Sequence, residues 1–306
     1  MIRYFYQLFL KDLLLGVLSI ITITLLAFLL ININSLNLSY NFAIFTLKLF
    51  SFKIFLASET SIFGLYFNNS LKVILPSFGI SLILGFIIGT ISGYFYKSKI
   101  TQYSNLIIYI FSALPVFVIA PILVVFAEQI DLPSIYVETQ IANSYVSFLS
   151  LIIPNLLIIV ICASVFAIFV RNSVIVELSN EYNKFLKAQG FSKVAIYFKS
   201  VFKNTFISFL PSALIIFTTI LSFDLIVERI FQVPGTSVIL MSALKNNGNL
   251  FFIYLIAMSL LILLLQLIIE VVLKIINPFE RVFLVKASKA HLDFADHLSK
   301  GVSNAS

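Results

Sequence analysis

Residues 177–211 read ELSNEYNKFLKAQGFSKVAIYFKSVFKNTFISFLP and form the longest polar, basic stretch between apolar segments of this chain. Ser179 or Asn180 is suited to cap a short helix, and Gly190 is suited to the left-handed residue that ends one. Ser192 then caps a second helix. The apolar residues predicted to share one face of that helix are Val194, Phe198, Val201 and Phe202. The stretch predicts a helix, a glycine turn and a helix between two membrane spans; a basic loop that only sets topology is the alternative.

The composition is that of a protein surrounded by lipid. Of the 306 residues, 60% are hydrophobic and 11% are charged, a balance that no soluble domain of this size needs. We therefore predict an all-α integral membrane protein with six transmembrane helices. The apolar runs expected to form them are residues 13–33, 73–96, 106–127, 146–170, 206–223 and 250–269. The single cysteine, Cys162, lies inside the fourth run, so a disulfide framework is excluded.

These spans divide the chain into three parts. The predicted parts are residues 1–71 (the first span and an outer amphipathic segment), 72–276 (the transmembrane core) and 277–306 (a polar tail). Lys48 and Lys53 make a further span before residue 72 costly, which favours an interfacial helix there. The central basic stretch gives the core a loop at residues 177–204 on the side of the membrane where both termini lie.

Two patterns inside the spans predict how the helices pack. Gly85, Gly89 and Gly93 are spaced by four residues in the second span. Small residues at this spacing lie on one helical face and let another helix approach closely. Pro115 and Pro121 interrupt the third span, where each is expected to kink the helix.

The positive charges fix the expected topology. With six spans, fifteen of the 20 Lys and Arg residues fall on the side of the termini and the central basic stretch. Cytoplasmic loops carry an excess of these residues, so both termini and the central stretch are predicted to be cytoplasmic. Because the lysines are spread through loops between spans, the expected partner of the net charge of +7 is the lipid bilayer and not nucleic acid.

Few residues suggest chemistry. No glycine is followed by Lys-Ser or Lys-Thr, so the chain lacks the phosphate-binding loop of ATPases, and it has no zinc-protease or serine-hydrolase motif. Asp224, at the end of the fifth predicted span, is hypothesised to line a substrate path; an interfacial position is the alternative. His291 and His297 in the tail are explained by a solvated helix with scattered polar residues, and no metal site is expected in the chain.

The central stretch also carries a family resemblance. A run of acid-Tyr, basic residues, Ala-x-Gly and then an amphipathic helix is typical of the cytoplasmic EAA loop of bacterial ABC importer permeases. The residues that match it in order are Glu181, Tyr182, Lys184, Lys187, Ala188 and Gly190, with Asn204 after Lys203. The chain resembles in particular the first of the two paired permeases of the dipeptide, oligopeptide and nickel importers.

The resemblance continues downstream. The family pattern Val-x-Glu-x-Ile-Phe-x-x-Pro-Gly is similar to residues 227–235, VERIFQVPG, and an acid followed by Asp-Pro-Arg is similar to Glu270 and Asn277-Pro278. Phe279 stands in place of the arginine. The outer segment after the first span is short for the family, and Asp224 is not expected there.

The resemblance implies a type I ABC importer permease (MetI-like) fold, in the inner membrane of a bacterium. It implies four kinds of partner: a second homologous permease subunit, two cytoplasmic ATPase subunits that bind the ATP and magnesium, and an extracellular solute-binding protein or lipoprotein. The chain itself would have no cofactor and no catalytic residue. The residues expected to couple it to the ATPases are Glu181, Tyr182, Phe185, Leu186, Ala188 and Gly190. The possible pathway or outer-gate residues are Asp224, Glu228, Pro234 and Gly235.

The expected function is therefore half of a translocation pathway for peptides. A nickel or metal-chelate importer of the same family is the alternative. From other classes, an integral membrane enzyme that acts on lipid would need a clustered catalytic set, and an ion-coupled carrier would need repeated halves with broken helices and midplane charges; neither is evident in the sequence.

Overall fold

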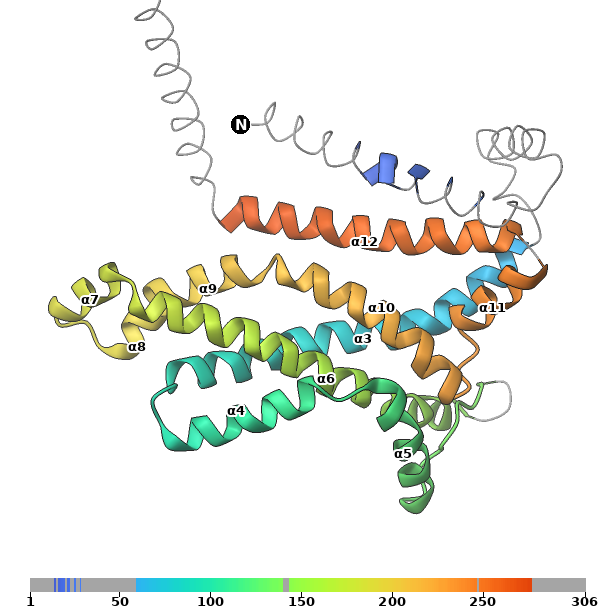
Figure 1. The fold of residues 1–306 in the computed structure, drawn as a ribbon, viewed down its shortest axis with the longest axis horizontal. Helices are drawn as coiled ribbons and strands as arrows, with labels where there is room; N and C mark the ends of the chain where they lie inside the picture. The colour runs from blue at the N-terminus through green and yellow to red at the C-terminus, as the bar shows by residue number, and fades with distance from the viewer. Residues whose placement is uncertain are drawn as a thin grey trace, which may run out of the picture. The chain divides into compact units, whose positions relative to one another are not determined.

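The computed structural model describes residues 59–139, 143–246 and 248–276, and near the N-terminus only residues 14, 16–19, 21–22, 25 and 28. All regular elements in this part of the chain are helices (Figure 1). They are α3 (Glu59–Tyr94), α4 (Lys99–Ser112), α5 (Val116–Gln129), α6 (Ser144–Ser179), α7 (Glu181–Ala188), α8 (Lys193–Ile196), the π-helical turn η2 (Tyr197–Val201), α9 (Phe202–Phe209), α10 (Ser212–Ile230), α11 (Thr236–Asn246) and α12 (Gly248–Ile276). The tail at 277–306, and most of the predicted first span and of the segment that follows it, lie outside these residues.

The predicted glycine seam joins α3 to α6. A Cβ atom placed on Gly85 would lie 2.3 Å from the Cβ of Phe166, and one on Gly89 would lie 2.6 Å from the carbonyl oxygen of Ala167. One on Gly93 would lie 2.7 Å from the Cβ of Val174. No larger residue fits at these three positions without a shift of α6, so the predicted close approach of two helices is present.

Polar and aromatic contacts extend this packing. The Ser77 hydroxyl on α3 donates to Oδ1 of Asn155 on α6 over 2.8 Å. Phe78 packs edge-on against Phe217 of α10, with ring centroids 5.0 Å apart. Phe166 of α6 packs in the same way against Phe209 of α9 at 5.4 Å. The core of this unit therefore lies between α3, α6, α9 and α10.

Helix α3 is longer than the sequence predicts. It begins at Glu59 and runs without a break to Tyr94, with Pro76 inside it. Residues 59–71, on the N-terminal side of the expected boundary at residue 72, continue this helix, and Phe63 is buried in the core.

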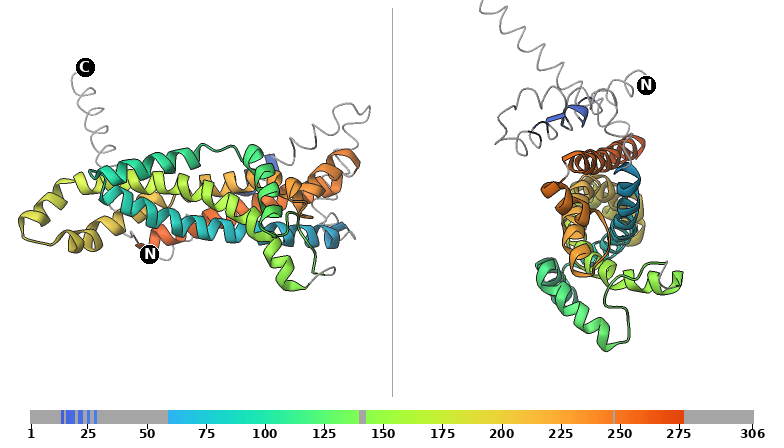
Figure 2. Two further views of the ribbon diagram at one scale, coloured as in Figure 1. Left: turned by 90° about the horizontal axis from the view of Figure 1, so that it is seen from below. Right: turned by 90° about the vertical axis from the view of Figure 1, so that its right-hand side faces the viewer.

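The third predicted span is not one kinked helix. Helices α4 and α5 meet at Pro115 with a bend of 95° (Figures 1 and 2). Pro115 is extended, with φ −76° and ψ 121°, and caps α5. A proline at the first turn of a helix is tolerated because its missing N–H has no partner there, whereas the residue before a proline disfavours helical geometry. The break is therefore complete where a kink was expected.

By length and composition, three described helical segments are apolar enough to cross a membrane, namely residues 62–94, 144–179 and 250–276. Two bent pairs pass the same test, α4 with α5 and the segment 194–209 with α10, which is bent by 46°. The described part of the chain thus offers up to five spans, and the first predicted span, residues 13–33, falls almost wholly outside it.

The end of the chain is a separate compact unit. It begins at Ile268, inside α12. Within it Lys274 Nζ lies 3.3 Å from Oε2 of Glu270, one helical turn away. The earlier part of α12 contributes Phe252, Ile253 and Tyr254 to a cluster with Ile239 of α11.

The glycine seam gives a direct prediction. We expect Gly89→Ala to destabilise the protein by about 1–3 kcal/mol, because the added methyl group meets the backbone of α6. Thermal unfolding of the purified full chain in detergent measures this effect. Gly79→Ala is the matched control, since among the described atoms none lies within 4 Å of a Cβ placed on Gly79 of the same helix. Equal melting temperatures for the two variants would contradict the seam.

Candidate functional site

Helix α7 is built as the sequence predicts. Asn180 occupies its N-cap with extended backbone (φ −62°, ψ 144°), although its side chain does not cap the helix. At the other end Gly190 has φ +87°. The Gly190 N–H donates to the carbonyl of Lys187 over 3.1 Å and the Phe191 N–H donates to that of Leu186 over 3.2 Å. These two bonds form a Schellman motif, in which a left-handed glycine ends the helix and satisfies its last carbonyls.

The turn then leads into the second predicted helix. The Ser192 hydroxyl accepts a hydrogen bond of 3.2 Å from the Ala195 N–H, so Ser192 is the predicted N-cap. The predicted shared apolar face is present for Val194, Phe198 and Phe202, which are all exposed, with the rings of Phe198 and Phe202 6.4 Å apart. It is wrong for Val201, because the helix changes to π-helical geometry at Tyr197–Val201. Val201 is buried while Phe198 is 68% exposed. An extra residue in the turn rotates the positions that follow it, which the regular 3.6-residue period does not anticipate.

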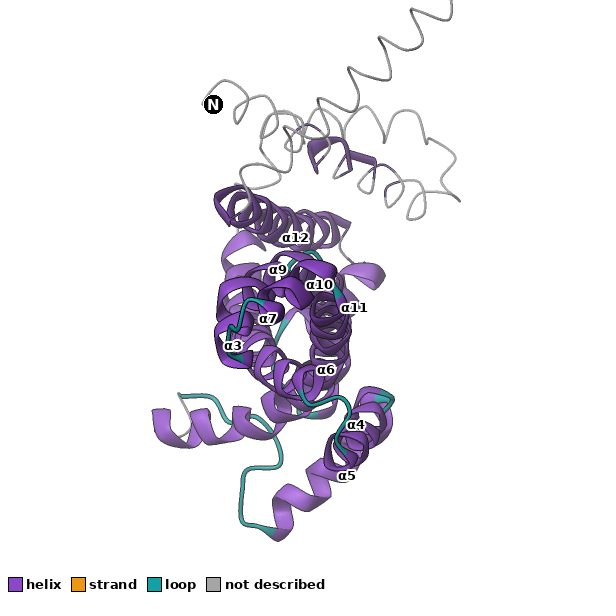
Figure 3. Cartoon of the chain, turned by 90° about the vertical axis from the view of Figure 1, so that its left-hand side faces the viewer, coloured by secondary structure: helices purple, strands orange, loops and turns teal. Residues whose placement is uncertain are grey.

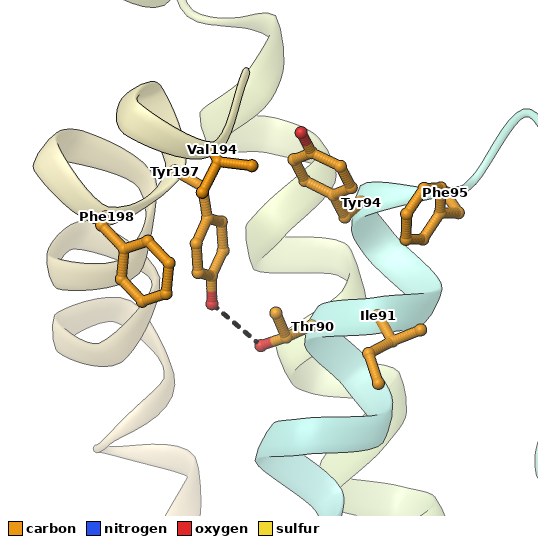
Figure 4. Close-up of a pocket in the computed structure, with 7 residues that line it drawn as sticks. All are labelled: Thr90, Ile91, Tyr94, Phe95, Val194, Tyr197 and Phe198. Carbon is orange, nitrogen blue, oxygen red and sulfur yellow. Dashed lines mark hydrogen bonds between the residues drawn. The ribbon is translucent and has the colours of Figure 1, made fainter. Parts of the chain in front are cut away.

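This second helix packs against the end of α3. The Tyr197 hydroxyl lies 3.4 Å from that of Thr90, and the rings of Tyr197 and Tyr94 meet edge to face at 6.0 Å. A shallow groove of about 200 Å³ opens beside this contact (Figure 4). The residues that line it are Thr90, Ile91, Tyr94, Phe95, Val194, Tyr197 and Phe198. The segment after Gly190 is thus held on α3.

The side chains of α7 divide into an exposed set and a buried set. Phe185 is 62% exposed, and Lys184, Lys187, Glu181 and Ala188 are exposed around it. Asn183 is buried, and Leu186 is half-buried. Helix α7 lies at one end of its bundle, seen end-on in Figure 3. The exposed ring of Phe185, flanked by charged side chains, is therefore available for contact with a partner protein.

Tyr182 belongs to both sets. Its ring is 41% exposed, yet its hydroxyl donates a short hydrogen bond to Glu177 at the end of α6. Asn204 of α9 donates to the same hydroxyl over 2.8 Å. Glu177 is the first residue of the stretch 177–211, but no local pattern singles it out, because Tyr182 and Asn204 reach it from two other helices.

A second polar cluster lies at the opposite end of the bundle, around Glu228. The side chain of Glu228 is 1% exposed. Its carboxylate accepts a short hydrogen bond from the Ser70 hydroxyl of α3 and one of 2.7 Å from the Ser237 N–H of α11. The Ser70 oxygen in turn accepts from the Thr236 N–H over 2.8 Å. Glu228 and Ser70 therefore satisfy the first two N–H groups of α11 and join α3, α10 and α11.

Pro234 and Gly235 form the turn that makes this clamp possible. A Cβ placed on Gly235 would lie 2.0 Å from Oε1 of Glu228, so only glycine leaves room for the carboxylate. The Pro234 carbonyl accepts a hydrogen bond of 3.2 Å from the Asn69 side chain. Both residues were predicted as possible gate residues, and the structure brings them together with Glu228.

Most residues between the fifth and sixth predicted spans are helical. Glu228 itself lies in α10, and Thr236–Asn246 form α11. Asp224 is likewise not at the end of its helix, because α10 continues to Ile230. Its side chain is 1% exposed, and among the described residues neither carboxylate oxygen has a hydrogen-bond partner. That Asp224 lines a substrate path stays a prediction, which requires the side chain to become accessible in another conformation.

A bundle of long apolar helices with a short charged helix at one end is the architecture expected of a multi-pass membrane protein. Residues 83–282 match the family described as binding-protein-dependent transport system inner membrane component. This match covers more than half of the chain, and the chain belongs to that family.

Curated relatives agree with this assignment. The chain is 30% identical over 217 residues to the oligopeptide transport system permease protein OppB of Mycoplasma pneumoniae, covering 70% of this chain and 56% of that protein. It is 27% identical over 219 residues to the OppB protein of Mycoplasma genitalium, covering 70% and 53%. A probable peptide ABC transporter permease protein of Sinorhizobium fredii is 29% identical over 169 residues, covering 54% of each. The chain spans about half the length of these relatives.

Among solved structures, the fold is similar to a chain of the MetNI methionine ABC transporter in an inward-facing conformation. The TM-score is 0.57 at 15% sequence identity, and the similarity covers 71% of this chain and 97% of the other. The predicted MetI-like permease fold is therefore confirmed.

The clamp is open to a double-mutant test. We expect Gly235→Ala to destabilise the protein because the methyl group displaces the Glu228 carboxylate, and Glu228→Ala to do so because it leaves two buried donors unpaired, at about 1–3 kcal/mol each. In the double variant the methyl group occupies the space that the carboxylate has left, so the two losses are less than additive by about 1–3 kcal/mol. Melting temperatures of the four chains measure this; strict additivity would show that the two residues do not interact.

Proposed function

We propose that this chain is the permease subunit of an ATP-binding-cassette importer and forms half of its translocation pathway. The observation that carries the proposal is α7, which exposes Phe185 between Lys184 and Lys187 at the end of the bundle. An apolar ring at the tip of a capped helix is suited to insertion into a groove of a soluble partner. The family assignment supports that partner being an ATPase.

The charge distribution supports a cytoplasmic position for α7 and for both termini. In the proposed mechanism two ATPase subunits bind on the cytoplasmic side, one on α7 and one on the corresponding helix of a second, homologous permease. Closure of the ATPases on ATP moves α7 as a rigid body. The attached helices α6 and α9–α10 carry the motion to the pathway between the two permeases. An extracellular solute-binding protein delivers the substrate.

Peptides are the proposed substrate class. The names of two relatives specify oligopeptide transport and that of the third specifies peptide transport. A nickel or metal-chelate substrate is the alternative to be tested. In either case the chain supplies a path and a mechanical link, and the proposed hydrolysis of ATP takes place in the partner subunits.

Co-purification and uptake test the function. The tagged full chain, expressed from its own chromosomal locus, is expected to co-purify with a second permease and with ATPase subunits, and its deletion is expected to abolish uptake of a radiolabelled hexapeptide. Loss of ⁶³Ni uptake with intact peptide uptake would move the substrate class to metal. Isolation of the chain without any ATPase would overturn the proposal.

In the same uptake assay, unchanged uptake and selectivity for Asp224→Asn would show that Asp224 does not line the substrate path.

Gly190 gives a sharper test of coupling. Among the described atoms none lies within 4 Å of a Cβ placed on Gly190, but its φ of +87° is strained for a β-branched residue. We expect Gly190→Val to distort the turn after α7, so that ATP hydrolysis persists while uptake falls at least about tenfold, since a strain of roughly 1–3 kcal/mol acts on this turn. Gly190→Asn is the matched control, because asparagine tolerates left-handed backbone. Normal uptake with the valine variant would contradict the role of this turn.

A further inference from the structure

The carboxylate of Glu177 lies where three helices meet. Glu177 is in the last turn of α6, three residues before Asn180, the N-cap of α7, and its side chain is half-buried. Its Oε2 atom accepts hydrogen bonds from the Tyr182 hydroxyl of α7, from the Asn180 amide over 3.2 Å and from the Asn204 amide of α9 over 3.3 Å. One oxygen thus has donors from α7, from α9 and from Asn180, the residue between α6 and α7.

The backbone of the same residue adds to the junction. The Glu177 carbonyl accepts a hydrogen bond of 2.6 Å from the side chain of Asn183, which is buried in α7, and one of 3.2 Å from the Asn180 N–H. The Asn204 amide also donates to the Tyr182 oxygen over 2.8 Å. Tyr182, Asn183 and Asn204 therefore form a closed network around Glu177.

This network determines how α7 is attached. A bare turn at Asn180 would let α7 pivot on α6, because only the backbone would join the two helices. Hydrogen bonds to a charged acceptor are about twice as strong as neutral ones, and here they fix α7 against both α6 and α9. We propose that Glu177 is the positioning residue that makes α6, α7 and α9 one rigid body, so that a force on α7 reaches both membrane segments.

The proposal rests on the proposed function of α7 and assigns Tyr182 a role beyond that of its ring. The resemblance to importer permeases implied that Tyr182 contacts the ATPase. The network separates the two parts of this side chain, since the residue is 41% exposed while its hydroxyl bonds to Glu177 and Asn204. Removing the hydroxyl alone therefore tests the network and leaves the ring in place.

Hydrogen exchange tests the attachment without any partner. In the purified full chain, Glu177→Ala is expected to speed amide exchange in residues 181–188 about tenfold, because Tyr182, Asn180 and Asn204 lose the shared carboxylate acceptor that ties α7 to α6 and α9. Glu177→Gln, which keeps a carbonyl acceptor, should restore most of the protection. Glu128→Ala, at an exposed position of α5, is the matched control and should leave α7 unchanged. Equal exchange of α7 in wild-type and Glu177→Ala chains would overturn the proposal.

Transport tests the consequence. In the transporter reconstituted with its co-purified ATPases, Tyr182→Phe and Glu177→Ala are expected to retain ATP hydrolysis but to import at least about fivefold less hexapeptide per ATP hydrolysed, since the transmission of a movement through a hinge depends on its stiffness. Tyr103→Phe, on the exposed surface of α4, is the matched control. Loss of the ATPases from Tyr182→Phe would make the hydroxyl a partner contact and overturn the positioning role. Should the wild-type chain bind no ATPase, the function proposed above fails, and the exchange result alone decides the role of Glu177.

Discussion

The close approach of α3 to α6 is the constraint on which both functional regions depend. Lipid tails are as apolar as the helix surfaces, so the helices are held together by dispersion and a few hydrogen bonds, and these require close contact. Gly85, Gly89 and Gly93 permit it. Helix α3 then carries Ser70 at one end and Thr90 toward the other, while α6 continues beyond the seam to Glu177. The seam thus fixes the distance between the clamp around Glu228 and the segment around α7.

Both regions use a carboxylate as a joint between helices. A charged group inside a protein is costly unless hydrogen bonds compensate its lost hydration. Glu228 has an N–H group of α11 and a hydroxyl of α3, and Glu177 has donors from α7 and α9 as well as Asn180. Each carboxylate therefore penalises any movement that separates its helices. Asp224 differs, because no described residue offers it a hydrogen bond, and it is the natural place to look for a change between conformations.

The sequence predicted those features that depend on local geometry. The left-handed Gly190, the Ser192 cap and the glycine spacing of α3 were all found where expected, since each follows from the backbone of a single segment. The features that were missed depend on partners distant in the chain. Helix α11 begins where Ser70 and Glu228 satisfy its first two N–H groups. Ser70 and Glu228 are themselves 158 residues apart in the chain. The π-helical turn and the full break at Pro115 are local geometries that the period of an apolar run does not distinguish from a continuous helix.

The amino-acid sequence by itself determined that the chain lies in a membrane, that its helices pack through small residues, and that a capped amphipathic helix interrupts the spans. These properties follow from composition and from the period of one helix. Only the tertiary structure decided which side chains hold the helices together. Glu177 and Glu228 are ordinary acids in the sequence and become joints because folding surrounds each with hydrogen-bond donors from other helices, an arrangement that no local pattern specifies.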